Sequence, residues 1–197
     1  MLSVKGVSAA GDRGGEDEDE RQRLDTAAET LIRLLTGGSL YLAAAESCTA
    51  GLAADALARV PGASVCFWGS FVCYTPQAKM NMLGLKEETL TTYGLVSEET
   101  ARAMALGALE KSGADAAFSI TGFAGPGSGI NAGLEVPAGT VWIATALQSS
   151  RPSDSCGTAE AVKFHFTGSR NQVRLQAARK ALEQIIQRLN KDTRKRG

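Results

Sequence analysis

A serine, a cysteine and a threonine stand together directly after an apolar run near the start of the chain. Residues 42–45 are apolar, Glu46 follows, and Ser47, Cys48 and Thr49 precede a stretch with helical spacing. This order predicts a buried strand that turns into the N-terminus of a helix, where backbone N–H groups have no partner within the helix. A nucleophile and donors for an oxyanion would then share one turn. The alternative is that Ser47 or Thr49 only caps the helix, and the turn taken alone favours the cap.

A glycine-rich stretch follows a predicted strand in the middle of the chain. Thr121 comes after the strand predicted over residues 114–120, and Gly122, Gly125 and Gly127 come next. Glycine has no Cβ, so backbone N–H groups in such a turn can approach an anion such as phosphate. The spacing differs from the dinucleotide-binding G-x-G-x-x-G, and the chain has no G-x-x-x-x-G-K-[S/T] loop. The stretch therefore predicts either a phosphate cradle or a mobile surface loop.

Two side chains are candidates for proton transfer. Tyr74 ends an extended stretch over residues 64–74, and Lys79 lies one turn into a helix that Pro76 opens, so both polar groups could share one rim. The alternative is a packed tyrosine and a solvated lysine. The single histidine, His165, lies in an alternating strand, which indicates a structural role and leaves lysine as the available base. A lysine acts as a base only when neutral, which requires burial or a nearby cation to lower its pKa.

The composition fits one globular domain that acts on a small molecule. The 197 residues are 44% hydrophobic and 21% charged, which suffices for a core without metal or disulfide staples. Lys+Arg and Asp+Glu both number 21, so the charge favours neither nucleic acid nor a membrane surface as a partner. The four cysteines lack zinc-site spacing, no run reaches the roughly 18 apolar residues of a membrane helix, and no export signal opens the chain. We therefore expect a cytoplasmic protein with reduced thiols that needs no metal and no cofactor.

Strand-like and helix-like segments alternate along the chain. The patterns predict strands at residues 40–45, 64–74, 114–120, 139–147 and 162–166. They predict helices at residues 24–35, 49–59, 76–83, 86–92, 98–111 and 170–189. Such alternation favours a three-layer α/β/α sandwich with a mostly parallel, mixed sheet, in which ligands gather at the carboxyl ends of the strands.

Charged tails flank the expected domain. Residues 1–22 contain small residues, glycines and an acidic run, a composition that predicts a flexible acidic tail. Residues 191–197 predict a basic tail, best explained as a solvated helix end. The folded domain is then expected over residues 23–190.

Five short blocks occur in a fixed order along the chain. They are Glu46-Ser47-Cys48-Thr49-Ala50-Gly51, Tyr74-Thr75-x-x-Ala78-Lys79, Tyr93-Gly94-x-Val96-Ser97, Ile120-Thr121-Gly122-x-Ala124-Gly125-Pro126 and Pro137-x-Gly139-Thr140-Val141-Trp142. Together they resemble the CinA C-terminal domain family over roughly residues 24 to 190, and five ordered blocks are more specific than any single one. The resemblance implies an amidohydrolase (deamidase) that converts nicotinamide mononucleotide to nicotinate mononucleotide and ammonia in pyridine nucleotide salvage. It also implies an α/β/α fold and a homodimer.

The resemblance implies catalytic roles, residue by residue. Ser47 is then the nucleophile, Lys79 the general base and Tyr74 a proton relay or orienting group. The backbone N–H groups of Cys48 and Thr49 would be the oxyanion donors. Cys48 is the rival nucleophile, because a helix N-terminus lowers the pKa of a thiol.

The same resemblance implies contacts with the substrate. The phosphate of the nucleotide needs backbone donors or an arginine, whose planar fork suits phosphate oxygens. Gly122 and Gly125 would supply the backbone donors, and Arg170 is carried over as a ligand contact from the family's G-x-R-x-x-[V/I]-R pattern. Thr121 ends a strand that faces the proposed site.

Two further charged residues have more than one explanation. Glu46 is expected to accept hydrogen bonds that fix the turn, with binding of the ribose or of the lysine base as alternatives. For Arg174, surface solvation explains the residue as well as a contact with the phosphate does.

Three departures from the family pattern affect these expectations. Ala50 stands where the family usually has glycine, and its methyl group could narrow the turn where the backbone approaches the ligand. Residues 127–136 are longer than expected, so the glycine stretch would differ in shape. The larger N-terminal domain of full-length members, which resembles molybdopterin-binding folds, has no counterpart before residue 24, so we expect a stand-alone version.

Two other functions stay open at this stage. The chain could be a non-catalytic nucleotide-binding or interaction module of the competence or damage type, or an amidase that acts on a different amide. The presence of Ser47, Tyr74 and Lys79 together argues against the module, because binding alone needs no base beside the serine.

Overall fold

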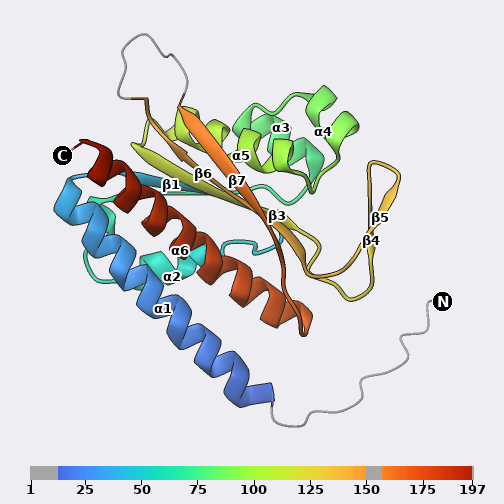
Figure 1. Cartoon of the computed structure of the whole chain (residues 1–197), viewed down its shortest axis with the longest axis horizontal. Helices are drawn as coiled ribbons and strands as arrows, with labels where there is room; N and C mark the ends of the chain where they lie inside the picture. The colour runs from blue at the N-terminus through green and yellow to red at the C-terminus, as the bar shows by residue number, and fades with distance from the viewer. Residues whose placement is uncertain (1–12, 150–156, 197) are drawn as a thin grey trace.

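A central sheet organises the chain in the computed structural model, which describes residues 13–149 and 157–196. Its strands lie in the order β2-β1-β3-β6-β7 (Figure 1). They are β1 (Leu42–Glu46), β2 (Phe67–Val72), β3 (Ala116–Gly122), β6 (Thr140–Leu147) and β7 (Thr158–His165). The helices are α1 (Arg13–Gly38), α2 (Leu52–Ala58), α3 (Pro76–Leu83), α4 (Glu87–Tyr93), α5 (Glu98–Ser112) and α6 (Arg170–Arg196), with a short 3-10 helix at Ala63–Val65.

The sheet is mixed and is covered by helices on both faces. β1 pairs in parallel with β2 and β3, whereas β6 runs antiparallel to β3 and β7 antiparallel to β6. Helices α1, α2 and α6 pack together on one face, and α5 covers the other face with α3 and α4 beside it (Figure 1). The predicted three-layer α/β/α sandwich with a mixed sheet is therefore confirmed.

Strand β1 is buried on both of its faces. Side chains alternate along a strand, so Leu42 and Ala44 join the core under α1, α2 and α6, whereas Ala43 and Ala45 join the core under α5. All four side chains are fully buried. This two-sided burial explains why the sequence shows an unbroken apolar run here instead of an alternating one.

Three parallel strands end at the same edge of the sheet. Glu46, the last residue of β1, is in register with Val72 of β2 and Ile120 of β3. Ser47 follows directly, and its backbone N–H donates to the carbonyl oxygen of Ile120 over 2.9 Å. The residues that follow β2 and β3 are thereby brought next to Ser47, where ligands of α/β sheets usually bind.

The acidic N-terminal segment is more helical than the sequence predicted, whereas the helix end predicted for the basic tail agrees with α6. Helix α1 begins at Arg13, so the flexible tail predicted over residues 1–22 is helical from that point, and residues 1–12 lie outside the described residues. Acidic residues early in a helix suit the positive end of its dipole. Glu20 also forms an ion pair with Arg179 of α6, which ties the start of α1 to the domain. Helix α6 continues to Arg196, through most of the predicted basic tail.

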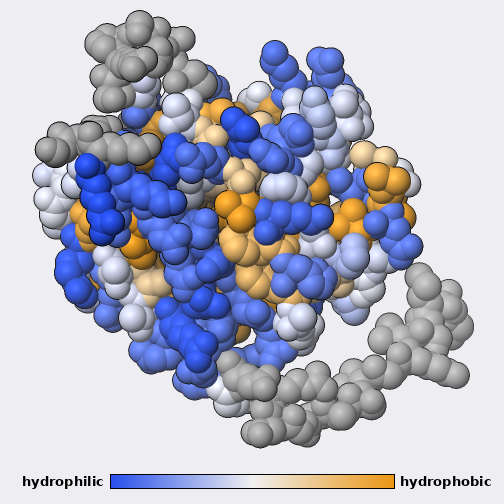
Figure 2. All heavy atoms as spheres, in the orientation of Figure 1, coloured by the Kyte–Doolittle hydropathy of each residue, from blue (hydrophilic) through white to orange (hydrophobic). Residues whose placement is uncertain are grey.

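Residues 129–136, for which the sequence predicted a loop, form a two-stranded hairpin. β4 (Gly129–Asn131) pairs antiparallel with β5 (Leu134–Val136). Ala132 and Gly133 have φ angles of 48° and 80°, the left-handed values that a tight hairpin turn requires. The hairpin projects from the body of the molecule (Figure 1), and its apolar side chains appear in orange in Figure 2. With three residues in each strand, the alternating pattern is too short to identify the strands from sequence.

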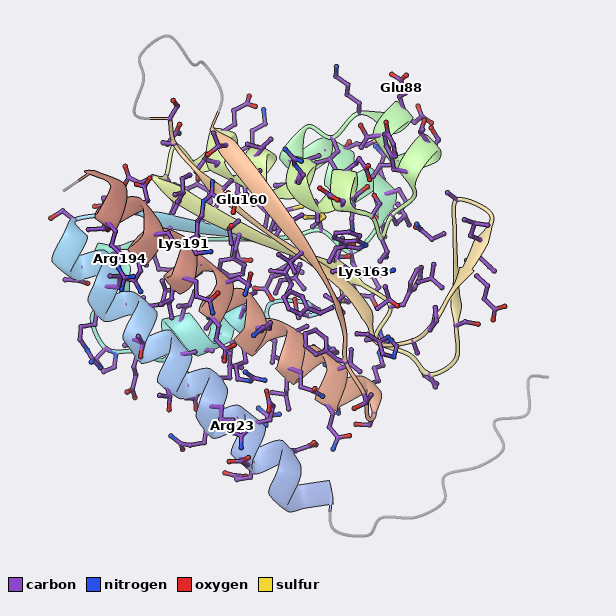
Figure 3. All side chains as sticks on the ribbon, in the orientation of Figure 1. Arg23, Glu88, Glu160, Lys163, Lys191 and Arg194 are labelled. Atoms are coloured by element: carbon purple, nitrogen blue, oxygen red, sulfur yellow. The ribbon has the colours of Figure 1, made fainter. Side chains whose placement is uncertain are left out.

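The outer face of α1 and α6 is hydrophilic, as the blue atoms in Figure 2 show. The six charged residues labelled in Figure 3 come from α1, α4, β7 and α6, and they are Arg23, Glu88, Glu160, Lys163, Lys191 and Arg194. None of the helices within the described part of the chain is both long and apolar enough to cross a membrane.

Candidate active site

Ser47 and Lys79 are in direct contact at the edge of the sheet where β1 ends. The Nζ atom of Lys79 lies 2.8 Å from the Oγ atom of Ser47 and donates to the carbonyl oxygen of Cys73, also over 2.8 Å. Lys79 reaches this place because α3 begins at Pro76, with Thr75 as its N-cap, immediately after the chain leaves β2. Two residues that are 32 positions apart in sequence thus form one hydroxyl–amine pair.

The amine of Lys79 is buried among neutral groups. The residue is 1% exposed. Burial lowers the pKa of Lys79 below its ordinary value of 10.5, because the charged form loses its solvation, and the nearby thiols of Cys73 and Cys48 oppose this shift only in part. A neutral amine at this distance can accept the proton of the Ser47 hydroxyl.

Glu46 fixes the turn that carries Ser47. Its carboxylate accepts hydrogen bonds from the backbone N–H groups of Gly51, Ala53 and Ala54 over 2.9–3.1 Å. The hydroxyl of Ser70 in β2 donates to the same carboxylate over 3.2 Å. The side chain is fully buried and does not line the cavity described below. Glu46 therefore holds the turn, as the first of its explanations predicted, and the structure does not support its prediction as a substrate contact.

Arg174 of α6 holds the same turn from another side. Its Nε donates to the carbonyl oxygen of Cys48 over 3.2 Å, and its Nη2 donates to the carbonyl oxygen of Thr49 over 2.8 Å. The guanidinium group thus binds two successive peptide groups of the turn and does not line the cavity. Neither surface solvation nor a phosphate contact describes this arrangement.

Donors for an oxyanion are available beside Ser47. The N–H of Ser47 is bonded to Ile120, and the N–H of Ala50 donates to the carbonyl oxygen of Ser47 over 3.0 Å. Within residues 13–149 and 157–196, the backbone N–H groups of Cys48 and Thr49 between them form no backbone–backbone hydrogen bond, and of these two residues only Cys48 lines the cavity described below. These are the two groups that the sequence analysis proposed as oxyanion donors.

Ala50 has a left-handed backbone with a φ of 51°, followed by Gly51 with a φ of 91°. The residue is exposed and does not line the cavity. The expectation that its methyl group would narrow the approach of a ligand is therefore wrong. The Cβ of Ala50 instead strains the backbone, because residues other than glycine disfavour left-handed values of φ.

Cys48 is not an activated thiol. It is 4% exposed, and burial raises its pKa to about 12. The predicted lowering of this pKa by a helix N-terminus is therefore wrong, because the loss of solvation outweighs the attraction of nearby cations. Cys48, Cys66 and Cys73 are free and buried, and Cys156 lies outside the described residues.

A cavity of about 230 Å³ opens over the Ser47–Lys79 pair. It is lined by Ser47, Cys48, Tyr74, Lys79, Leu95, Val96, residues 121–129 and Arg170. The described lining contains the guanidinium group of Arg170 and no carboxylate, so the cavity suits an anionic ligand. No group of three or more His, Cys, Asp or Glu side chains in the described part of the chain is placed to hold a metal ion.

Arg170 forms hydrogen bonds with two other residues that line this cavity. Its Nη1 donates to the carbonyl oxygen of Gly125 over 2.6 Å, and its Nη2 donates to the hydroxyl oxygen of Tyr74 over 2.7 Å. Tyr74 is 53% exposed, so it stands at the mouth of the cavity, whereas Lys79 lies at the buried end. The guanidinium group has five N–H donors, so several remain for a ligand.

Eight of the ten predicted site residues line the cavity: Ser47, Cys48, Tyr74, Lys79, Thr121, Gly122, Gly125 and Arg170. Glu46 and Thr49 do not, and both are fully buried. The hydroxyl of Thr121 is already engaged, since it donates to the carbonyl oxygen of Leu95 over 2.7 Å. Gly122 has no room for a side chain, because a Cβ would lie 2.7 Å from the carbonyl oxygen of Thr140.

The sequence analysis missed the apolar wall of the cavity. Leu95 and Val96 line it, and so does Phe123. Leu95 and Val96 fall within or beside the block Tyr93-Gly94-x-Val96-Ser97, so the block marked the segment, but apolar side chains gave no chemical signal. His165 lies at the end of β7 and does not line the cavity, as its strand pattern predicted.

The protein is thus an α/β/α sandwich with a serine beside a buried lysine in one cavity. A family model, the CinA C-terminal domain, matches residues 24–189, and the chain belongs to this family. It is 42% identical over 164 residues to a CinA-like protein of Chlorobaculum tepidum, which covers 83% of this chain and 37% of that protein. A CinA-like protein of Endomicrobium trichonymphae is 40% identical over 165 residues, 84% of this chain and 36% of that protein. The chain thus spans little more than a third of the length of these curated relatives.

Solved structures of similar length share the fold. The competence/damage inducible protein CihA from Agrobacterium tumefaciens is 40% identical with a TM-score of 0.76, covering 85% of this chain and 96% of that one. A competence-damaged protein (CinA) superfamily protein from Escherichia coli is 33% identical with a TM-score of 0.75, covering 92% of this chain and 95% of that one. These similarities place the whole described domain within the CinA fold.

Proposed function

We propose that this protein is an amidohydrolase that converts nicotinamide mononucleotide and water to nicotinate mononucleotide and ammonia, as an enzyme of pyridine nucleotide salvage. The observation that carries the proposal is the 2.8 Å contact between Oγ of Ser47 and Nζ of a lysine that is 1% exposed. A buried amine with a lowered pKa beside a hydroxyl is the arrangement that nucleophilic catalysis by serine requires. The choice of amide rests on the resemblance to the amidohydrolases of the family.

The proposed reaction has two half-reactions. The neutral amine of Lys79 takes the proton of the Ser47 hydroxyl as Oγ attacks the carboxamide carbon. The backbone N–H group of Cys48, a residue that lines the cavity, stabilises the negative oxygen of the tetrahedral intermediate. The C–N bond then breaks, the nitrogen takes the proton from Lys79, and ammonia leaves an acyl ester on Ser47. Water attacks this ester, and Lys79 takes one proton of the water and returns it to Oγ as the ester bond breaks. The carboxylic acid then loses its remaining proton to ammonia or solvent, and the carboxylate product is released.

The charge of the cavity supports an anionic substrate. Arg170 and the turn at Gly125 stand at the mouth, where the phosphate of a nucleotide would lie when its amide reaches Ser47. Tyr74 is bonded to Arg170 and stands at the same mouth. We therefore assign Tyr74 the task of orienting Arg170, while Lys79 transfers the proton.

The test is ammonia release from nicotinamide mononucleotide by the wild type, Ser47→Ala and Cys48→Ala. We expect release by the wild type, a loss of about a thousandfold or more in Ser47→Ala, and retained turnover in Cys48→Ala. Ser64→Ala, an exposed serine away from the cavity, is the matched control and should behave as wild type.

Other outcomes of this test separate the alternatives. Release from other amides but not from nicotinamide mononucleotide would replace the substrate and keep the mechanism. Tight nucleotide binding without release by a folded wild type would contradict an enzyme and support the binding module.

A further inference from the structure

One side chain connects the projecting hairpin to the wall of the cavity. The Oδ1 atom of Asn131 in β4 accepts from the backbone N–H of Val96 over 2.9 Å. Its Nδ2 donates to the carbonyl oxygens of Val96 and Tyr93 over 3.1 and 3.2 Å. Asn131 therefore provides hydrogen-bond partners for backbone groups of Tyr93 and Val96. It lies 35 residues after Val96 in the sequence.

The shape of this segment is adapted to Asn131. Gly94 has a φ of 80°, and a Cβ built there would lie 2.2 Å from Oδ1 of Asn131. A side chain at Gly94 would thus occupy the space that the amide fills. The absence of a Cβ and the three hydrogen bonds are separate observations, and both indicate a specific contact.

The hairpin has little else to hold it in place. Within the described residues, β4 and β5 pack mainly against each other and against no other helix or strand to a comparable extent. Ile130 and Leu134 are 71% and 72% exposed. A two-stranded hairpin of this size is not stable by itself, so its position depends on the few contacts at its base and on Asn131.

Both partners of this contact line the active cavity. Leu95 and Val96 line it from the 93–96 segment, and residues 127–129 line it where the chain enters the hairpin. The hydroxyl of Thr121 donates to the carbonyl oxygen of Leu95, and the hydroxyl of Thr100 donates to that of Gly94. Asn131 adds the bonds that hold the two ends of the segment, at Tyr93 and Val96. None of these bonds reaches Ser47 or Lys79, which are held by α3 and the turn after β1.

We propose that Asn131 is a positioning residue that clamps the hairpin to the 93–96 segment and so sets how tightly the cavity binds its substrate. The kinetic part of this proposal rests on the amidohydrolase function proposed above. Loss of the clamp lets the wall formed by Leu95 and Val96 move away from the glycine stretch. The distance between Ser47 and Lys79 is unchanged, so binding weakens while the chemical step persists.

The test compares Asn131→Ala and Asn131→Asp with Ile130→Ser, a matched control on the same strand whose side chain is 71% exposed and does not line the cavity. In both Asn131 variants we expect KM for nicotinamide mononucleotide to rise about tenfold, with kcat changed by less than about twofold. The aspartate keeps the acceptor for Val96 but places a carboxylate against two carbonyl oxygens, so it should not rescue binding. Ile130→Ser should leave both constants unchanged.

Hydrogen exchange of the full chain gives a readout that does not depend on turnover. In Asn131→Ala, amide exchange should become faster together at residues 93–97 and 129–136, and stay unchanged at residues 42–49. Faster exchange confined to the hairpin, or an unchanged KM in an active enzyme, would overturn the clamp. If the wild type releases no ammonia, the proposed function fails, and the exchange result alone decides the clamp.

Discussion

Burial of Lys79 removes the solvation of its amine, which reduces the stability of the folded protein. Its hydrogen-bond partners are the hydroxyl of Ser47 and a backbone carbonyl, and neither carries a charge that would stabilise an ammonium group. A methionine of similar length would fill the same space without this cost. Functional sites often retain residues that reduce stability in this way. Here the loss of stability accompanies a neutral amine beside Ser47.

Catalysis by Lys79 predicts a specific dependence on pH. Because the reaction needs the neutral amine and burial lowers the pKa of Lys79, kcat/KM should rise with pH and level off above an inflection that lies below 10.5. Initial rates of ammonia release across the pH range in which the protein stays folded would measure this inflection. A rate that falls with rising pH over that range would contradict a lysine base.

The same pKa shift links stability to pH. The unfolded chain binds the Lys79 proton more tightly than the folded protein does, so the free energy of unfolding rises with pH between the lowered pKa and 10.5. We expect Lys79→Met to raise the free energy of unfolding by about 1 kcal/mol near neutral pH, a gain that shrinks toward pH 10.5. Urea unfolding at two pH values measures the difference. A Lys79→Met variant that is less stable than the wild type near neutral pH would contradict the expected free-energy cost of burying the amine.

Ala50 offers a second test at a single residue. Its φ of 51° costs an L-residue about 1–2 kcal/mol, and glycine relieves most of that cost. Ala50→Gly should therefore increase the free energy of unfolding by about 1 kcal/mol, after the greater chain entropy of glycine is subtracted. Because Ala50 does not line the cavity, KM should not change. Denaturant unfolding checks the first expectation, and a decrease in stability would contradict the strain.

At the scale of elements, Glu46 joins the end of β1 to the start of α2 and to β2. One carboxylate accepts three backbone N–H groups and one hydroxyl. Glu46→Gln replaces an acceptor oxygen by a donor that faces other donors, which should lower the free energy of unfolding by about 2–3 kcal/mol. Ser70→Ala removes only one of the four bonds and should cost about 1 kcal/mol, as urea unfolding can measure. Equal effects of the two substitutions would show that Glu46 is not the centre of the turn.

Elements with strong local signals were predictable, and those fixed by distant contacts were not. Helix α3 has the predicted bounds at residues 76–83, because Thr75 caps it, Pro76 opens it and Gly84 ends it with a φ of 72°. The hairpin at 129–136 was missed, since its strands are short and Asn131 ties it to residues 93–96, which are distant in sequence. The early start of α1 was missed for a similar reason, because Glu20 finds its partner in α6.

At the scale of the molecule, the site exists because three parallel strands end in register. The residues alone could place Ser47 and Thr121 at strand ends, suggest Lys79 as a base and predict that Glu46 fixes the turn, and the resemblance added Arg170. Neither could show that burial would raise the pKa of Cys48 or that Leu95 would form a wall of the cavity. Those outcomes depend on burial, which the packing of the whole sandwich decides. The homodimer implied by the resemblance stays a prediction.

The central claim is that Lys79 acts as the base for Ser47 in amide hydrolysis. Ammonia release from nicotinamide mononucleotide by Lys79→Met, beside the wild type and the exposed-lysine control Lys163→Met, tests it most directly. The account predicts a loss of about 10²- to 10⁴-fold in kcat for Lys79→Met, with an unchanged fold, and no loss for Lys163→Met. Turnover by folded Lys79→Met at the wild-type rate would contradict the account.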